Sequence, residues 1–253
     1  MSHKRICILG ESPLVEEYAS LCLNKGFEVH VRMNTGESSV SKKASTALPK
    51  DAKKIARVTR TTDLALELTN ISAEAKKKNL DELDKVLPLK IPILSSSVMF
   101  TVAEQRAWIS RPARLIGLGA LPSLLEGELI EFALSDSTDT AVRHAAEEFA
   151  KALGKESAIV ADSVGLVLPR ILCTLANEAC FAIMESVAPA GDIDTAMKLG
   201  TNYPFGPLEW AERIGMRQVH AVMAALYKNL GEDRYRVAPL LRRAAALNGF
   251  PAK

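Results

Sequence analysis

The first part of the chain has the pattern of a β-α-β unit. Residues 5–9 are a short apolar run that ends at Gly10, which is typical of a buried parallel strand. Apolar residues between Leu14 and Leu23 then repeat at helical spacing, a glycine stops the helix, and residues 27–31 begin a second strand. Two parallel strands joined by a right-handed helical crossover begin a doubly wound sheet, so this feature restricts the chain to an α/β fold.

Strands and helices continue to alternate over the next hundred or so residues, as in other doubly wound sheets. Further strands are expected at residues 65–68, 91–94, 114–118, 129–134 and 157–161, and a helix at about 140–153. The run Lys76-Lys77-Lys78 is expected on the solvated face of a helix. Residues 34–54 contain few apolar anchors and are expected to form a flexible surface loop. The sequence therefore predicts an α/β Rossmann-like dinucleotide-binding domain over residues 1–161.

The pattern changes after Gly165, because apolar residues then recur with helical period to the end of the chain. Pro207 fits the first turn of one helix, and Gly231 fits the end of another. One broad apolar stripe is formed by Leu168, Ile171, Leu172, Leu175, Ala179, Ala182 and Ile183. We expect a second, all-α domain over residues 162–253.

Composition excludes several classes of function. Hydrophobic residues make up 48% of the chain and charged residues 25%, and the formal net charge is +2. So small a charge does not favour a nucleic acid or a membrane surface as a partner. The four cysteines have no metal-ligand spacing, and Cys173 and Cys180 lie two helical turns apart, as core residues do. No apolar run is long enough to span a bilayer, so we expect a cytoplasmic protein.

Several motifs occur in an order that is characteristic of one enzyme family. They are Arg111-Pro112, residues 148–155, Asp162-Ser163-Val164-Gly165, residues 192–200 and Tyr203-Pro204-Phe205-Gly206-Pro207. Together they resemble the 3-hydroxyacyl-CoA dehydrogenases over almost the whole chain. The resemblance implies a Rossmann-like domain followed by an all-α domain of the 6-phosphogluconate-dehydrogenase-like type. It also implies an acyl-CoA substrate, NAD as the cofactor and a homodimer formed through the helical domain.

The resemblance assigns four catalytic positions, and most of them carry the wrong residue. In the family a His removes the proton from the 3-hydroxyl group, a Glu orients that His, and a Ser and an Asn bind the substrate. In an ungapped register the His position is Gly119, the Glu position is Glu131, the Ser position is Val98 or Met99, and the Asn position is Pro169. A one-residue gap would bring Ser97 to the Ser position instead. Only Glu131 is retained in the ungapped register, and glycine cannot accept a proton.

The cofactor loop also departs from the family pattern. The family has Gly-x-Gly-x-x-Gly after the first strand, where the glycines let the backbone approach a diphosphate. Here the loop reads Gly10-Glu11-Ser12-Pro13-Leu14-Val15, so only the first glycine remains. Met33 takes the place of the acidic residue that binds the ribose. Its neighbour Arg32 leaves NADP open as a cofactor, but we favour a structural role for Arg32.

Two hypotheses follow from these substitutions. The first is an active NAD(P)-dependent oxidoreductase of a 3-hydroxyacyl-CoA or similar hydroxy acid, in which Glu131, a water molecule or a relocated group acts as the base. The second is a catalytically impaired homologue that keeps the fold and the dimer and binds a ligand or a partner enzyme. The motifs of the helical domain are retained beside an altered reaction centre, and this pattern favours the second hypothesis.

Overall fold

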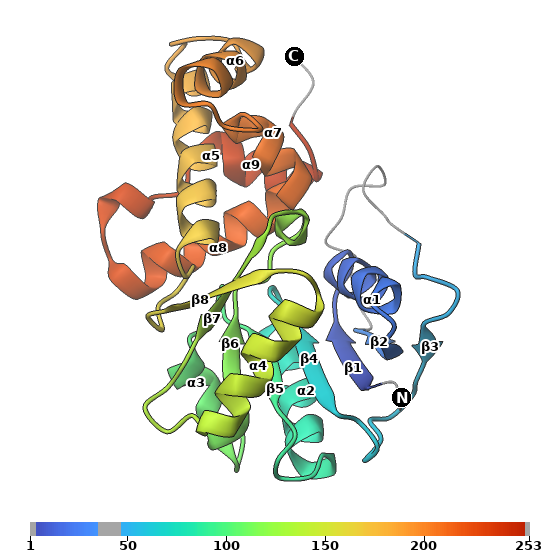
Figure 1. The fold of residues 1–253 in the computed structure, drawn as a ribbon. Coiled ribbons are helices and arrows are strands. Elements are labelled where there is room, and N and C mark those ends of the chain that lie inside the picture. Colours follow the sequence, from blue (N-terminus) through green and yellow to red (C-terminus); the bar gives the residue numbers. More distant parts are fainter. Residues whose placement is uncertain (1–3, 35–46, 251–253) are drawn as a thin grey trace.

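A computed structural model describes residues 4–34 and 47–250, which form a mixed sheet followed by a group of helices (Figure 1). In the described residues eight strands make one sheet in the order β3-β2-β1-β4-β5-β6-β7-β8. The strands are β1 (Arg5–Gly10), β2 (Glu28–Met33), β3 (Lys53–Lys54), β4 (Leu64–Leu68), β5 (Ile93–Ser96), β6 (Leu115–Leu118), β7 (Leu129–Ala133) and β8 (Glu156–Val160). Neighbouring strands are parallel except β6 and β7, which are antiparallel.

Helices cover both faces of this sheet because side chains alternate between its faces. Ile6 and Ile8 of β1 pack in a core with helices α1 (Leu14–Asn24) and α4 (Thr140–Ala152). Cys7 and Leu9, the alternate residues, pack in a second core with α2 (Ala73–Val86) and α3 (Val102–Arg106). Burial on both faces explains why the strands read as continuous apolar runs. We call the part of the structure up to Val160 the sheet half.

The chain from residue 167 to 250, the helical half, packs against one end of the sheet (Figure 1). Its helices are α5 (Leu168–Met184), α6 (Ala190–Thr201), α7 (Pro207–Ile214), α8 (Met216–Leu230) and α9 (Pro239–Leu247). Their shared core also contains Val98, Met99 and Leu121 of the sheet half, so apolar packing is continuous between the halves. Cys173 and Cys180 are buried in this core, as predicted.

Several residues of the motif at 192–207 form the cap at the start of α7. The carboxylate of Asp194 in α6 accepts hydrogen bonds from the backbone N–H groups of Leu208 at 2.8 Å and Glu209 at 3.2 Å. These are first-turn donors of α7 that have no partner within that helix. A Cβ atom at Gly206 would lie 2.2 Å from Asp194 Oδ1, so only glycine allows this approach. Pro207 begins α7 and Gly231 ends α8, both as predicted.

Two expectations about the sheet half need correction, and one helix was missed. Lys76 is not solvated: its side chain is fully buried and pairs with the buried carboxylate of Glu67. Lys53 and Lys54, expected in a loop, form the edge strand β3, while residues 35–46 of that loop lie outside the described residues. Helix α3, with its capping box of Thr101 and Glu104, was not predicted.

The boundary between the two expected domains, after residue 161, stays a prediction. It falls in the connection between the end of β8 and the start of α5. Among the helices of the described residues, none has the length and apolar character needed to cross a membrane. The same residues contain no group of His, Cys, Asp and Glu side chains that could hold a metal ion.

Candidate functional site

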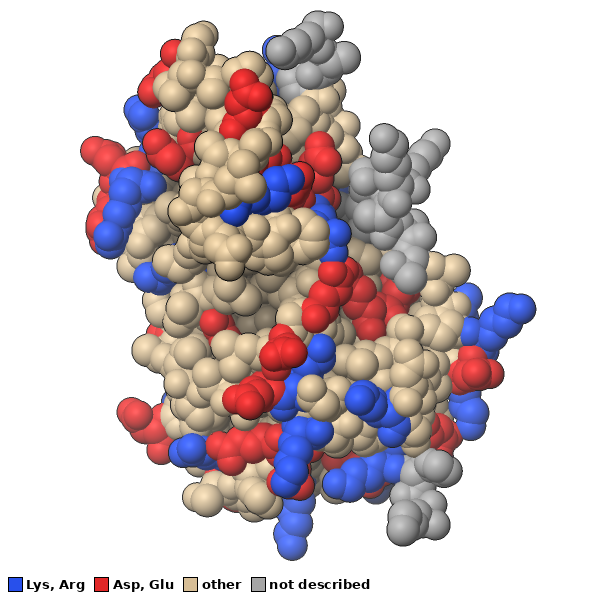
Figure 2. Space-filling view, turned by 45° about the horizontal axis from the view of Figure 1, so that its top comes forward, with Lys and Arg blue, Asp and Glu red and all other residues tan. Residues whose placement is uncertain are grey.

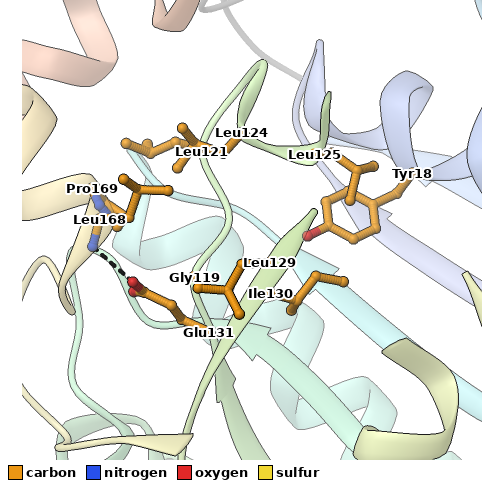
Figure 3. A pocket seen from close by; sticks show the side chains of 10 residues that line it. All are labelled: Tyr18, Gly119, Leu121, Leu124, Leu125, Leu129, Ile130, Glu131, Leu168 and Pro169. Carbon is orange, nitrogen blue, oxygen red and sulfur yellow. Dashed lines mark hydrogen bonds between the residues drawn. The ribbon is translucent and has the colours of Figure 1, made fainter. Parts of the chain in front are cut away.

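Three of the four predicted catalytic positions lie together where the sheet half meets the helical half. Gly119 follows β6, Glu131 lies in β7, and Pro169 lies in the first turn of α5 (Figure 3). They line a cavity of about 10 Å³, whose remaining walls are Tyr18, Leu121, Leu124, Leu125, Leu129, Ile130 and Leu168. A volume of this size holds about one water molecule. The three positions therefore enclose only a small space.

The Glu131 carboxylate is directed at the backbone of α5 (Figure 3). One oxygen accepts a hydrogen bond from Val167 N at 3.0 Å, and the other accepts one from Leu168 N at 2.8 Å. Glu131 is 6% exposed. A carboxylate at this point satisfies helix N–H groups that have no partner within the helix and interacts favourably with the helix dipole. Glu131 therefore acts as a cap that connects β7 to the start of α5.

Gly119 packs closely against Glu131 and Leu166. Its backbone N–H donates to Glu131 O at 2.9 Å. A Cβ atom at this position would lie 3.1 Å from Glu131 Cβ and 3.3 Å from Leu166 Cδ1. Both distances are shorter than ordinary van der Waals contact, so a larger side chain would have to displace its neighbours. Glu131 and Leu166 thus occupy part of the space that the side chain of a general base at position 119 would need.

The fourth position, Val98, does not line the cavity. Its side chain is fully buried in the core of the helical half, and its carbonyl accepts a hydrogen bond from Gly165 N at 2.8 Å. Ser97, the alternative at this position, is also fully buried. Its hydroxyl donates to Ser95 O at 3.2 Å and accepts from Gln105 Nε2 of α3 at 2.8 Å. In either register the side chain at this position lies outside the cavity that Gly119 lines.

No histidine replaces the missing base among the described residues that line the cavity. His144 is exposed on α4, as expected. His220 lies on α8, where burial, together with the nearby charge of Arg242, lowers its pKa. His30 lies in β2 and contacts Glu28 at 3.1 Å.

The cofactor loop is tightly packed against β4. A Cβ atom at Gly10 would lie 2.7 Å from the carbonyl carbon of Leu68, so this glycine lets β1 and β4 approach. The Ser12 hydroxyl donates to Glu16 Oε1 at 2.8 Å. Leu14 is fully buried under the sheet in the α1 core. The loop residues therefore serve the packing of the sheet half.

Negative charge collects at the start of α1. Glu11, Glu16 and Glu17 lie within seven positions of one another, at the helix end where a diphosphate binds in dinucleotide-binding folds. Burial raises the pKa of Glu11, although hydrogen bonds from Gln218 and from the backbone of Asn70 and Ile71 counteract part of that effect. Glu11 lies in the loop itself, directly after β1, and its carboxylate there opposes the approach of another anion.

At the end of β2 the predicted ribose-side residues have structural contacts. The Arg32 guanidinium donates to Glu82 Oε2 at 2.6 Å, to Asn79 Oδ1 at 3.1 Å and to Ala56 O at 3.4 Å. Met33 is half-buried and packs against the core beneath α1. These contacts connect β2 to α2 and to the segment after β3.

A larger cavity, of about 510 Å³, was not predicted from the sequence. It lies between α1, the turn at Leu124–Glu126 and the end of α7, and its charged walls are Glu17, Glu126 and Arg213. Ser123 N donates to both Glu17 oxygens at 3.1 Å, and burial raises the pKa of Glu17 to about 7. Acidic side chains gather at this junction of the halves (Figure 2). Two carboxylates facing one guanidinium disfavour the phosphates of an acyl-CoA here.

The comparisons with known proteins agree with this architecture. The family model of the 3-hydroxyacyl-CoA dehydrogenase C-terminal domain matches residues 165–253. A 3-hydroxybutyryl-CoA dehydrogenase from Clostridioides difficile is 30% identical over 191 residues, which are 76% of this chain and 68% of that protein. One from Bradyrhizobium diazoefficiens is 35% identical over 71% of this chain, and the match spans 61% of that relative.

Solved structures extend the likeness to the whole chain. The crystal structure of (S)-3-hydroxybutyryl-CoA dehydrogenase from Ralstonia eutropha matches with a TM-score of 0.78 and 26% identity, and the match covers the whole of both chains. A 3-hydroxybutyryl-CoA dehydrogenase from Escherichia coli matches 97% of this chain and 57% of its own, with a TM-score of 0.77. At 18% identity, that second match supports the fold alone.

Proposed function

This chain belongs to the 3-hydroxyacyl-CoA dehydrogenase family, and we propose that it is a member that keeps the family fold without catalysing the family reaction. The observation that supports this most directly is the position of Glu131. Both of its carboxylate oxygens accept hydrogen bonds from the backbone of α5. In the family reaction this residue would have to orient an imidazole instead.

Removal of a proton from a 3-hydroxyl group requires a base within hydrogen-bond reach of that group. Position 119 offers no such side chain, and its Cα is closed in by Glu131 and Leu166. The cavity beside it has a volume of about 10 Å³, which is small for an acyl thioester. A relocated base would need both space and a free proton acceptor. The cavity is small, and the carboxylate that lines it, Glu131, already accepts hydrogen bonds from two backbone N–H groups at the start of α5.

The cofactor implied by the family also fits this loop poorly. A nicotinamide dinucleotide requires close backbone approach at the glycine positions and unopposed N–H groups at the start of α1. Ser12 and Val15 replace two of the glycines, and Glu11, between Gly10 and Ser12, adds a carboxylate. We therefore propose that the chain binds neither NAD nor NADP with physiological affinity, and we derive no hydride transfer for it.

The second part of the proposal is that the helical half forms a homodimer. Several large apolar side chains of this half are exposed in the single chain: Val167, Ile171, Met184, Val187, Leu199, Tyr203 and Tyr227. Exposed apolar surface of this kind is typical of a protein-protein contact. A stable, non-catalytic dimer would act by binding a ligand or a partner enzyme.

Calorimetry and a reductase assay test the proposal together. The protein is titrated with NADH, NADPH and acetoacetyl-CoA, and the oxidation of NADH by acetoacetyl-CoA is followed in parallel. We expect no saturable binding of either nucleotide at millimolar concentration and no turnover above the protein-free rate. Turnover that disappears in Glu131→Gln would support the alternative, an active NAD(P)-dependent oxidoreductase, and would overturn the proposal.

A further inference from the structure

The crevice at the centre of the sheet is where a ligand is expected in this class of fold. In a doubly wound sheet, ligands bind outside the carboxyl ends of the strands at the point where the strand order reverses. Here that point lies between β1 and β4, which are adjacent although they are not consecutive in the chain. Glu11 directly follows β1, and Asn70 and Ile71 follow β4.

The side chain of Glu11 makes its hydrogen bonds at these strand ends. Its Oε1 accepts a hydrogen bond from Gln218 Nε2 at 2.7 Å, and its Oε2 accepts one from Ile71 N at 3.4 Å. Gln218 belongs to α8, so the first of these bonds joins the sheet half to the helical half. Gln218 is 0% exposed and Glu11 is half-buried, so the contact between them is partly buried.

From Gln218 the hydrogen bonds continue across the strand ends. Asn70 Nδ2 donates to Gln218 Oε1 at 3.2 Å and to Ala120 O at 2.9 Å. Asn70 Oδ1 accepts from the Ser96 hydroxyl at 2.5 Å. The resulting chain of contacts, which we call the polar bridge, comprises Glu11, Gln218, Asn70 and Ser96. It connects the ends of β1, β4, β5 and β6 with α8.

The amides of the polar bridge are well satisfied, because the Gln218 and Asn70 side chains each use both their oxygen and their nitrogen. In a buried region, a network of this kind is mutually reinforcing, and a partner that is left without its bond is costly. A ligand that entered the crevice would have to break the Glu11–Gln218 bond and place its own charge beside the Glu11 carboxylate. Both effects oppose an anionic ligand.

We infer that the polar bridge replaces a bound dinucleotide in this chain: Glu11 occupies the crevice, excludes diphosphate-containing ligands and fixes the helical half on the sheet. This inference rests on the proposed function and explains how the cofactor site was lost. It assigns to Glu11 and Gln218 a role in positioning the two halves. Neither residue has a role in the reaction that the resemblance implies.

A double-mutant cycle tests the bond itself. Thermal unfolding is measured for the wild type, Glu11→Ala, Gln218→Ala and the double variant. Because each single change breaks the same bond, we expect the double variant to lower Tm by clearly less than the sum of the two single shifts. Shifts that add would overturn the inference. A wild type that proved catalytically active would contradict the proposed function without affecting this result.

Ligand exclusion is tested by binding of NADH, detected by its fluorescence, to the wild type, Glu11→Gly and Glu11→Gln. We expect Glu11→Gly to bind NADH at least about tenfold more tightly than the wild type, which corresponds to about 1.4 kcal/mol. Glu11→Gln fills the same volume without charge, so its affinity should lie between the two. Glu17→Gln is the matched control: it removes a charge from the same end of α1 outside the polar bridge, and we expect no gain.

Equal weak binding by the wild type and both Glu11 variants would overturn the exclusion role of Glu11. If Glu11→Gly does not fold, the comparison of Glu11→Gln with Glu17→Gln still decides the question. In that case a gain confined to Glu11→Gln supports the inference, and equal behaviour of the two variants overturns it.

Discussion

Single carboxylates hold separate parts of this structure together, and Glu131 is the clearest example. The same side chain that would orient a base in a dehydrogenase here satisfies two backbone donors at the start of α5. Its position in β7 was predicted from the register of the family motifs. Its contacts were not, because the segment around residues 166–168 returns to β7 only after α4 and β8 have been placed.

Glu131→Gln tests this structural role. The amide can accept only one of the two hydrogen bonds and turns a donor toward the other N–H, so we expect a loss of about 1–3 kcal/mol in the free energy of unfolding. The measurement is urea denaturation followed by circular dichroism. Glu128→Gln, at an exposed position just before β7, is the control and should change stability little. Equal stability of the two variants would contradict the cap.

The raised pKa of Glu17 predicts that the stability of the protein depends on pH. The Glu17 pKa is raised to about 7, chiefly by burial; the Glu126 and Glu16 charges add to the rise, while Ser123 N and Arg213 oppose it. The folded state therefore binds more protons than the unfolded state between about pH 4.5 and 7. The free energy of unfolding should fall as the pH rises through this range. In Glu17→Gln this contribution should vanish, which denaturation at several pH values would detect as a flatter profile.

At the scale of helices and strands, most boundaries could be predicted because each has a local chemical cause. Pro207 begins α7, Gly231 ends α8, and a continuous buried run that ends at Gly10 marks β1. The rotation of a helix about its axis is harder to predict from one sequence. The lysines at 76–78 look equivalent, yet α2 buries Lys76 against Glu67 of β4 and leaves Lys77 and Lys78 exposed. Their different environments depend on how the helix packs on the sheet.

The buried pair of Lys76 and Glu67 should therefore matter far more than its neighbours. Burial lowers the pKa of Lys76, and the Glu67 carboxylate opposes that shift. Lys76→Met removes the ion-pair partner of Glu67 in a fully buried position, and we expect a loss of about 3–5 kcal/mol in the free energy of unfolding. Lys78→Met, two positions away and exposed, is the matched control. Thermal unfolding of both variants checks the difference, and similar Tm values would contradict it.

For the whole molecule, the fold could be predicted almost completely, whereas the reaction centre could be predicted only as a set of positions. The β-α-β pattern and the helical motifs specify the architecture, and the solved structures match it. Gln218 carries no signal in the sequence, because its role depends on α8 reaching across to Glu11. Contacts between the halves arise only once both are folded and packed together.

The exposed apolar side chains of the helical half predict a homodimer. Sedimentation should give a species near twice 27.4 kDa at micromolar concentration. Val187→Glu and Leu199→Glu place charges on two of the most exposed apolar positions, and we expect either change to shift the equilibrium toward the monomer. A wild type that remains monomeric at high concentration would show that this surface has another use.

The central claim is that the family fold persists here without the family reaction, and a single-turnover experiment tests it most directly. The protein is held in excess over acetoacetyl-CoA with NADH present, and NADH absorbance is followed over hours. Loss of a general base alone leaves a rate only about 10²–10⁴-fold below that of an intact enzyme, which this experiment detects. The account predicts oxidation no faster than without protein. Protein-dependent oxidation that is absent from Glu131→Gln would contradict it.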